Sequence, residues 1–70
     1  MDMVSVSSSN LSAVGYDEDS ALLQIEFKSG VVYEYYDVPK YEYEGLMAAD
    51  SLGKYADQNI YKHYRQSKIR

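Results

Sequence analysis

An alternation of apolar and polar residues is the clearest pattern in the chain, and it falls on residues 22–28, LLQIEFK. Leu23, Ile25 and Phe27 lie on one side of an extended segment, and the polar residues between them lie on the other. Residues 11–17 and 31–37 are also rich in residues that favour strands, and short turns separate the three segments. The pattern predicts three consecutive antiparallel strands, with residues 3–6 as a short extra strand or a segment across the sheet edge.

The turn after Phe27 decides the register of the second hairpin. A two-residue turn at residues 29–30 would place Glu34 on the apolar face, where an unpaired carboxylate is costly. A three-residue turn over residues 28–30, with Gly30 in the left-handed conformation, keeps Glu34 on the polar face. We predict the second register, because a slip of one residue would invert the whole strand. It pairs apolar residues with one another: Phe27 with Val31, Ile25 with Tyr33 and Val14, and Leu23 with Tyr35 and Tyr16.

Helical spacing follows the strands. Pro39 suits the first turn of a helix, where its missing N–H costs little, and Tyr43 and Leu46 recur at helical spacing. Gly45 inside this helix is unfavourable by ~1 kcal/mol relative to alanine, which indicates close packing or a short helix. Ser51 is a candidate N-cap for a second helix.

The second predicted helix runs through residue 65 and has two distinct faces. One face is a packing stripe: Leu52, Tyr55, Ala56, Asn59, Ile60, His63 and Tyr64. The other face is polar and basic: Lys54, Asp57, Gln58, Tyr61, Lys62 and Arg65. The predicted fold class is therefore α+β, a three-stranded antiparallel meander with the possible addition of residues 3–6, followed by two helices packed on one face.

The predicted domain is residues 1–70, with residues 1–9 as a partly flexible N-terminus and residues 66–70 as a flexible basic tail. The residues assigned to its core share the inner sheet face or the helical stripes: Tyr16, Leu23, Ile25, Phe27, Tyr33, Tyr35, Tyr43, Leu46, Tyr55, Ile60 and Tyr64. Tyr36 and Tyr41 fall outside these faces. They are candidate interface residues, because tyrosine is enriched at protein interfaces.

Length and composition narrow the class of protein. A chain of 70 residues buries a small core, so self-association stays open as a source of stability. The chain has no cysteine, which excludes disulfides, cysteine-ligated zinc and thiol chemistry and suits a reducing cytoplasm. It also has no secretory signal and no membrane-length apolar run. We expect a soluble cytoplasmic domain.

Charge is segregated along the chain. Residues 1–53 carry a net charge of −8, and residues 54–70 carry +4, within a total of −4. One interpretation is charge compensation within the molecule together with a solvated basic tail. The other is a local site for anions on the last helix.

Catalytic signatures are missing. His63 is the single histidine, and its place on the packing stripe predicts a half-buried structural residue. Gly53 and Lys54 lack the upstream glycine of a phosphate-binding loop. Asp17 and Asp19 lack the glycine and glutamate of a calcium loop. We therefore expect a protein that is not an enzyme and uses neither a cofactor nor a metal.

Binding of single-stranded nucleic acid or an RNA loop requires cations for phosphates and flat side chains for bases. The C-terminal segment interleaves both, and the candidate residues are Lys54, Tyr61, Lys62, Arg65 and Lys68. Two alternatives stay open. One is a protein-interaction adaptor or homo-oligomer that uses exposed tyrosines, and the other is a pocket for a small anionic nucleotide near residues 51–54.

Several short motifs occur in order along nearly the whole chain. The first four are SSNL at residues 8–11, GYD at residues 15–17, Y-x-Y at Tyr33 and Tyr35, and VP at residues 38–39. The last is a block formed by Ser51, Gly53, Lys54, Tyr55, Ile60 and Tyr64. In this the chain resembles the KTSC domain family, found at the C-terminus of some lysyl-tRNA synthetases and as small stand-alone bacterial and phage proteins. The attachment to tRNA-handling enzymes implies RNA binding. Ala56 and Asp57 depart from the family pattern of an aromatic residue followed by asparagine, and Asp57 weakens the attraction of Lys54 for phosphate.

Overall fold

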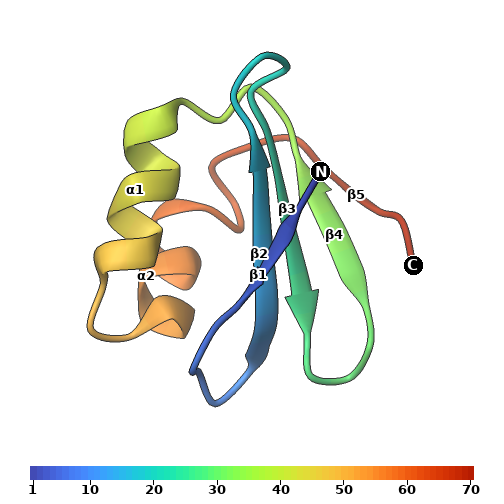
Figure 1. Ribbon diagram of the computed structural model, residues 1–70. Helices are drawn as coiled ribbons and strands as arrows, with labels where there is room; N and C mark the ends of the chain where they lie inside the picture. The colour runs from blue at the N-terminus through green and yellow to red at the C-terminus, as the bar shows by residue number, and fades with distance from the viewer.

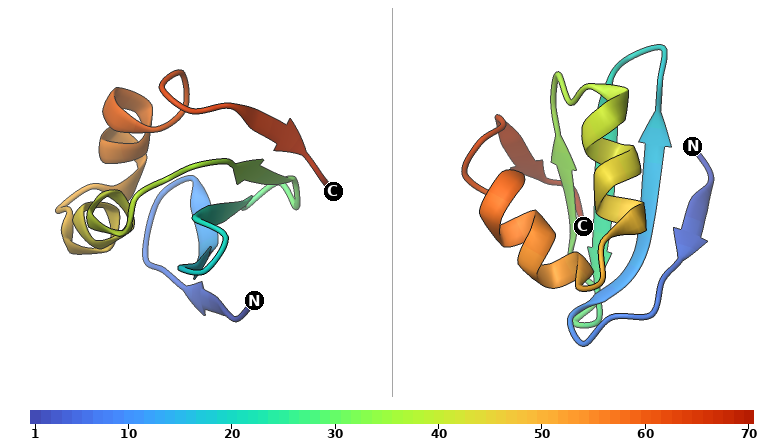
Figure 2. Two further views of the ribbon diagram at one scale, coloured as in Figure 1. Left: turned by 90° about the horizontal axis from the view of Figure 1, so that it is seen from above. Right: turned by 90° about the vertical axis from the view of Figure 1, so that its left-hand side faces the viewer.

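Five antiparallel strands form one sheet whose spatial order follows the sequence, β1-β2-β3-β4-β5, in a computed structural model that describes residues 1–70. The strands are β1 (Met3–Ser5), β2 (Leu11–Asp17), β3 (Leu22–Phe27), β4 (Val32–Tyr35) and β5 (Gln66–Lys68). Helices α1 (Lys40–Ala48) and α2 (Leu52–Asn59) lie between β4 and β5 in the chain. Both helices cover the same face of the sheet (Figures 1 and 2). The predicted α+β class and the extra N-terminal strand are confirmed, but the sheet has five strands rather than three or four.

The register predicted for the second hairpin is confirmed. Leu23 pairs with Tyr35 and Ile25 with Tyr33. The N–H of Phe27 donates to the Val31 carbonyl at 2.9 Å. Gly30 has a φ of +94°, as a left-handed turn position requires. The apolar side chains of β3 and β4 therefore share the face that the helices cover.

The segment after α2 differs from the prediction. The helix ends at Asn59 instead of continuing to residue 65, and residues 66–68 form β5 instead of belonging to a flexible tail. The N–H groups of Tyr36 and Val32 donate to the carbonyls of Arg65 and Arg70, both at 2.9 Å. Pairing with β5 satisfies backbone groups that a free edge of β4 would leave to solvent. This gain overrides the local helical pattern.

The core lies between the sheet and the helices. Its buried residues are Leu11, Val14, Leu23, Ile25, Tyr35, Val38, Leu46, Ala56 and Ile60. The other predicted core residues pack against it while partly buried: Tyr16, Phe27, Tyr33, Tyr43, Tyr55 and Tyr64. The predicted list lacked Leu11, Val14, Val38 and Ala56, and His63 is exposed instead of half-buried because the helical stripe ends before it.

Helices α1 and α2 pack closely at Gly45. A Cβ atom at this position would lie 2.9 Å from Cζ of Tyr55, so the ring of Tyr55 occupies the space that a larger residue would need. Ser51 caps α2 as predicted, because its Oγ accepts a hydrogen bond from the N–H of Lys54 at 3.3 Å. Neither helix is long and apolar enough to cross a membrane.

Candidate functional site

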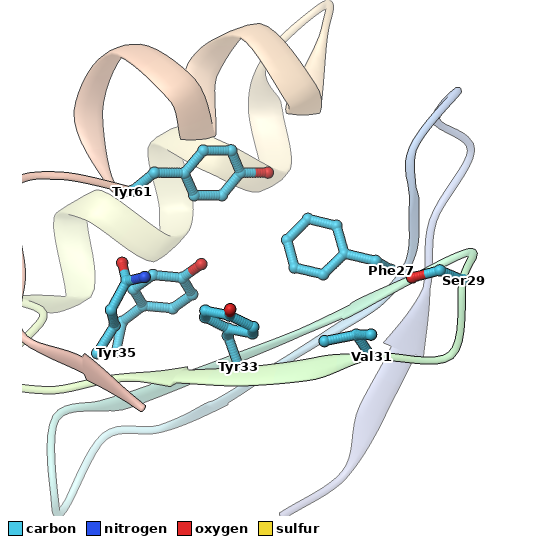
Figure 3. Close-up of a pocket in the computed structure, with 7 residues that line it drawn as sticks. Phe27, Ser29, Val31, Tyr33, Tyr35 and Tyr61 are labelled. Atoms are coloured by element: carbon cyan, nitrogen blue, oxygen red, sulfur yellow. The ribbon is translucent and has the colours of Figure 1, made fainter. Parts of the chain in front are cut away.

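A pocket of about 420 Å³ opens on the helix-bearing face of the sheet, beside β5. Five of its seven lining residues are apolar or aromatic. The lining residues are Phe27, Ser29, Val31, Tyr33, Tyr35, Tyr61 and Gln66 (Figure 3). This is the larger of two hollows in the molecule.

Strand alternation and the path of the chain after α2 build the pocket. Tyr33 and Tyr35 are two residues apart on β4, so their side chains leave the same face of the sheet. Gln66 of β5 lies opposite Tyr35 in the sheet register. Tyr61 comes from the segment that links α2 to β5 and lies across the pocket from Tyr33 and Val31 (Figure 3).

The aromatic rings form a continuous wall. The ring centroids of Phe27 and Tyr33 are 6.2 Å apart in an edge-to-face arrangement, and those of Phe27 and Tyr61 are 5.9 Å apart. Tyr61 also stacks on Tyr35, with centroids 6.2 Å apart and planes inclined by 27°. Distances of this size are typical of favourable aromatic pairs. The wall is therefore preorganised and presents both ring faces and ring edges.

The hydroxyl groups of the pocket tyrosines form no hydrogen bond within the chain, in contrast to those of four tyrosines elsewhere. The Tyr16 hydroxyl donates to the Val38 carbonyl at 2.6 Å. The hydroxyls of Tyr36, Tyr55 and Tyr64 donate to glutamate carboxylates. The Tyr35 hydroxyl keeps only a small contact with solvent, because the residue is 1% exposed and no completely buried side-chain oxygen lacks a partner. Three phenol hydroxyls, those of Tyr33, Tyr35 and Tyr61, are thus free to bind a ligand at the pocket.

The pocket environment raises the pKa of two of these phenols above the ordinary value of 10.0. Burial raises the pKa of Tyr35 strongly, and the neighbouring Tyr61 and Tyr33 raise it further. Burial also raises the pKa of Tyr61, with a smaller contribution from Asp57. Because the neutral phenol both donates and accepts hydrogen bonds, each of these hydroxyls can meet either kind of polar group on a ligand.

Five of the seven cations form no ion pair. The two pairs that form are Lys40 with Glu18 at 3.3 Å and Arg70 with Glu26 at 3.0 Å. Lys28 directly precedes Ser29 of the pocket, and Lys62 directly follows Tyr61. Lys68 is opposite Tyr33 in the register, so its side chain leaves the sheet on the pocket face. Of these three lysines, Lys68 is the one that the strand register places on the pocket face.

The candidate nucleic-acid residues are only partly brought together. Tyr61 lines the pocket and is half-buried instead of lying on an exposed helical face, because the helix has ended before it. Lys62 directly follows the lining residue Tyr61, and Lys68 lies on the pocket face of β5. Lys54 lies in the first turn of α2 and is not among the lining residues. Arg65 does not continue a helix, and its guanidinium lies 5.1 Å from the centre of the Tyr36 ring.

The two candidate interface tyrosines have different surroundings. Tyr36 is half-buried, and its hydroxyl donates to Glu34 at 3.1 Å while Arg65 covers its ring. Tyr41 is 70% exposed and has no aromatic or ionic partner. Of the two, Tyr41 alone presents a free aromatic surface.

Glu42 forms a second polar cluster, which the sequence analysis missed. Its carboxylate is buried and accepts hydrogen bonds from Tyr55 at 2.7 Å and Tyr64 at 2.9 Å. The hydrogen bond to Glu42 raises the pKa of Tyr55, while burial followed by the same bond raises that of Tyr64. The four-residue spacing between Glu42 and the buried Leu46 is the signal that could have revealed it. The cluster ties the segment that carries Tyr61 to α1.

Acidic residues do not assemble a metal site. No group of three or more histidine, aspartate or glutamate side chains is positioned to hold a metal ion. In the turn after β2, the Asp17 carboxylate accepts hydrogen bonds from the Asp19 N–H at 3.1 Å and the Ser20 hydroxyl at 3.0 Å. These bonds give the acidic turn a structural role.

A five-stranded antiparallel sheet, two helices between its last two strands and an aromatic pocket at the final pair of strands define a small α+β domain. The chain belongs to the KTSC domain family, whose model matches residues 7–64. This confirms the resemblance seen in the sequence motifs.

Relatives match over nearly the full length of the chain. An uncharacterized protein of Stutzerimonas stutzeri is 41% identical and is aligned over 99% of both chains. A protein of Tsukamurella paurometabola is 35% identical over 90% of this chain and 94% of its own. The crystal structure of a KTSC domain protein from Yersinia pestis superimposes with a TM-score of 0.93, at 34% identity, over 99% of this chain and 97% of its own.

Proposed function

We propose that this protein is a non-enzymatic module that binds single-stranded RNA and takes one nucleobase into the aromatic pocket. The supporting observation is the combination of an aromatic wall with three phenol hydroxyls that have no partner in the chain. A nucleobase has a planar face that stacks on aromatic rings and a polar edge that hydrogen-bonds. The pocket complements both features.

The lysines around the pocket supply the phosphate contacts in this proposal. Lys28, Lys62 and Lys68 are unpaired and belong to three different segments. A strand that places a base in the pocket would pass its backbone near them. The remaining surface is acidic, with a net charge of −4 for the molecule, and repels a long duplex. A short single strand or an RNA loop is the ligand that we propose, and we propose a cytoplasmic location for the protein.

Fluorescence anisotropy with a labelled single-stranded RNA of about ten nucleotides tests the proposal. In low salt we expect a Kd of roughly 10 µM or tighter, weakening as salt is added. Absence of binding at these concentrations would contradict the proposed function.

Matched charge reversals locate the binding surface. Lys68→Glu should weaken binding about tenfold or more, because it puts a negative charge beside the pocket. Lys54→Glu makes the same charge change at a residue outside the pocket and should have a clearly smaller effect. Equal losses in the two variants would indicate non-specific attraction to the basic segment. Circular dichroism establishes that both variants are folded.

A second candidate function is association with a protein partner or a second copy of the chain. Tyr41 is 70% exposed and Val4 of the edge strand β1 is 47% exposed. A smaller hollow of about 220 Å³, lined in part by Met3, Val32 and Ile69, lies on the face away from the helices. Analytical ultracentrifugation tests self-association, and a single monomeric species at every concentration would exclude it.

A further inference from the structure

We infer that two copies of this chain associate edge to edge through β1, with their two β1 strands antiparallel, and so form one continuous sheet. This pairing does not depend on RNA binding. It gives the second candidate function a defined surface, a defined partner and a defined register. The observations that carry it are the hydrogen-bonding direction and the packing of β1.

β1 is an edge strand with one unpaired side. Figure 2 shows it at the rim of the sheet, to one side of both helices, where β2 is its only neighbour. The N–H of Val6, just after β1, donates to the carbonyl of Ser12 in β2 at 3.1 Å. Backbone groups of successive residues in an antiparallel strand point to alternate sides. Those of Val4 therefore also point towards β2, whereas those of Met3 and Ser5 point away from the sheet.

Side chains hold this edge in place on both faces of the sheet. On one face, a Cβ atom added to Gly15 of β2 would meet the sulfur of Met3 and would lie 3.0 Å from that of Met1. On the other face, Val6 packs against the core. The edge is thus already extended and anchored. A second strand can pair with it without first paying the entropy of ordering it.

The two edges of the sheet differ in their protection. Charged side chains on an edge strand, lysine above all, oppose pairing with another sheet. β5 contains Lys68 and lies between Arg65 and Arg70. β1 contains no charged residue, and its central Val4 is 47% exposed. β1 is therefore the edge that is open to another strand.

β1 is complementary to a second copy of itself. A two-fold axis at Val4 places this residue opposite its own copy and places Met3 opposite Ser5 of the partner subunit. The outward groups of Met3 and Ser5 then form about four backbone hydrogen bonds between the two chains. Asp2 lies opposite Val6 of the partner subunit, so the register sets no like charges directly opposite each other.

A closed dimer is favoured over a chain of copies. All neighbouring strands of the sheet are antiparallel, so β1 and β5 run in the same direction. Pairing of β1 with β5 of another copy would be parallel and would repeat without closing. Pairing of β1 with β1 uses the more stable antiparallel ladder and ends at two copies. It also leaves the aromatic pocket accessible, because the pocket lies beside β5 at the opposite edge.

Cysteine cross-linking tests this geometry. The chain has no cysteine, so a single introduced thiol can form a disulfide only with its copy. Val4→Cys should give a disulfide-linked dimer on mild oxidation, because facing residues of this non-hydrogen-bonded kind have Cα atoms about 4.5 Å apart. Ser5→Cys is the matched control. Its two copies lie on a diagonal of about 7–8 Å and should give at least about fivefold less linked dimer.

A proline in β1 tests the backbone pairing. Ser5→Pro removes an N–H that points away from the sheet, so β1 keeps its bonds to β2 while each copy loses a bond to the other. Analytical ultracentrifugation should show a dimer dissociation constant raised about tenfold or more. Circular dichroism establishes that the variant is folded.

The outcomes distinguish this pairing from the alternatives. A dimer in which Val4→Cys links no better than Ser5→Cys, or in which Ser5→Pro has no effect, would overturn pairing through β1. Preferential linking of Ser67→Cys, at the centre of β5, would place the interface at the other edge and would overturn it too. A chain that is monomeric at every concentration would overturn the inference and leave β1 to a strand of another protein, without bearing on RNA binding.

Discussion

The phenol of Tyr16 donates to a backbone carbonyl at 2.6 Å, whereas the phenols of Tyr33, Tyr35 and Tyr61 bond to nothing in the chain. At the scale of single residues, the rings of these four tyrosines all pack in or against the core, but their hydroxyls differ in whether they form a hydrogen bond. Tyr35 shows that one residue can serve both purposes, because its ring is buried in the core while its hydroxyl opens to the pocket. Packing and binding are therefore separable by removing a single oxygen atom.

Tyr16→Phe should lower the free energy of unfolding by about 1 kcal/mol, because it removes a hydrogen bond and leaves the Val38 carbonyl without its donor. Tyr33→Phe is the matched control and should leave stability unchanged within about 0.5 kcal/mol, since its hydroxyl has no partner to lose. Urea unfolding followed by circular dichroism measures both. A Tyr33→Phe variant as unstable as Tyr16→Phe would show that the Tyr33 hydroxyl is bonded.

Alkaline pH should destabilise the protein. Burial raises the pKa of Tyr35 and Tyr64 above the ordinary value of 10.0, and the Glu42 hydrogen bond raises that of Tyr55. A raised pKa means that the folded state holds the phenol proton more tightly than the unfolded chain does. The stabilisation is thus complete below the unfolded pKa and is lost as pH rises from about 10 towards the folded values.

Urea midpoints between pH 8 and pH 11 measure this effect, with phenolate absorbance recorded in parallel. The midpoint should be constant up to about pH 9 and fall beyond it. A midpoint that stays constant to pH 11 would contradict the raised pKa values of the buried tyrosines.

At the scale of elements, the meander was predictable because its signals are local. Alternation in β3 and the left-handed glycine at position 30 were sufficient to select the register that the structure shows. β5 was not predictable in this way, because residues 66–68 are all polar and show no alternation of apolar and polar residues. Their strand conformation comes from β4, which is distant in sequence. The pocket was not predicted for the same reason, because its lining residues Tyr61 and Gln66 reach the sheet through the pairing of β5 with β4.

Gly45→Ala should destabilise the protein by about 1–3 kcal/mol, because the added methyl group meets the Tyr55 ring. Helix propensity alone gives the opposite sign, since alanine is favoured over glycine by ~1 kcal/mol. Gly53→Ala supplies the control within α2. A Cβ there approaches only Nδ2 of Asn10, at 4.0 Å, so this variant should be neutral or more stable. Thermal unfolding should therefore show a lower melting temperature for Gly45→Ala and an unchanged or higher one for Gly53→Ala, and a stabilised Gly45→Ala variant would contradict the close packing of α1 on α2.

At the scale of the whole molecule, the fold determines which cations form ion pairs and which stay unpaired. The sequence shows that acidic and basic residues are segregated, but only the fold shows which basic residues form ion pairs. Arg70 is used in an ion pair with Glu26, and Arg65 is stacked on Tyr36. Lys68 instead stays unpaired and lies on the pocket face of β5. The sequence thus indicated the basic end of the chain, and the strand pairing decides which cations can act together.

The salt dependence of the proposed RNA binding should report how many lysines contact phosphates. Three phosphate contacts on a single strand give a slope of about −2 when log K is plotted against log salt concentration. Lys68→Gln should reduce the slope to roughly −1.4, because it removes one contact. Anisotropy titrations over a range of salt concentrations measure both slopes. A slope near −3.5 would require all five unpaired cations and would contradict a binding surface restricted to the pocket.

Because β5 is the last strand in the sequence, the pocket forms only when the C-terminal residues pair with β4. Tyr33 pairs with Lys68 across 35 residues of sequence, so one wall of the pocket is completed only when the last residues dock. Such non-local, short and exposed strands are the segments that open most readily under native conditions. A ligand bound against β5 would stabilise the docked strand by mass action. Amide hydrogen exchange in residues 66–68 should therefore slow down when a ligand fills the pocket. The exchange rate of β5 would then show whether the pocket is occupied.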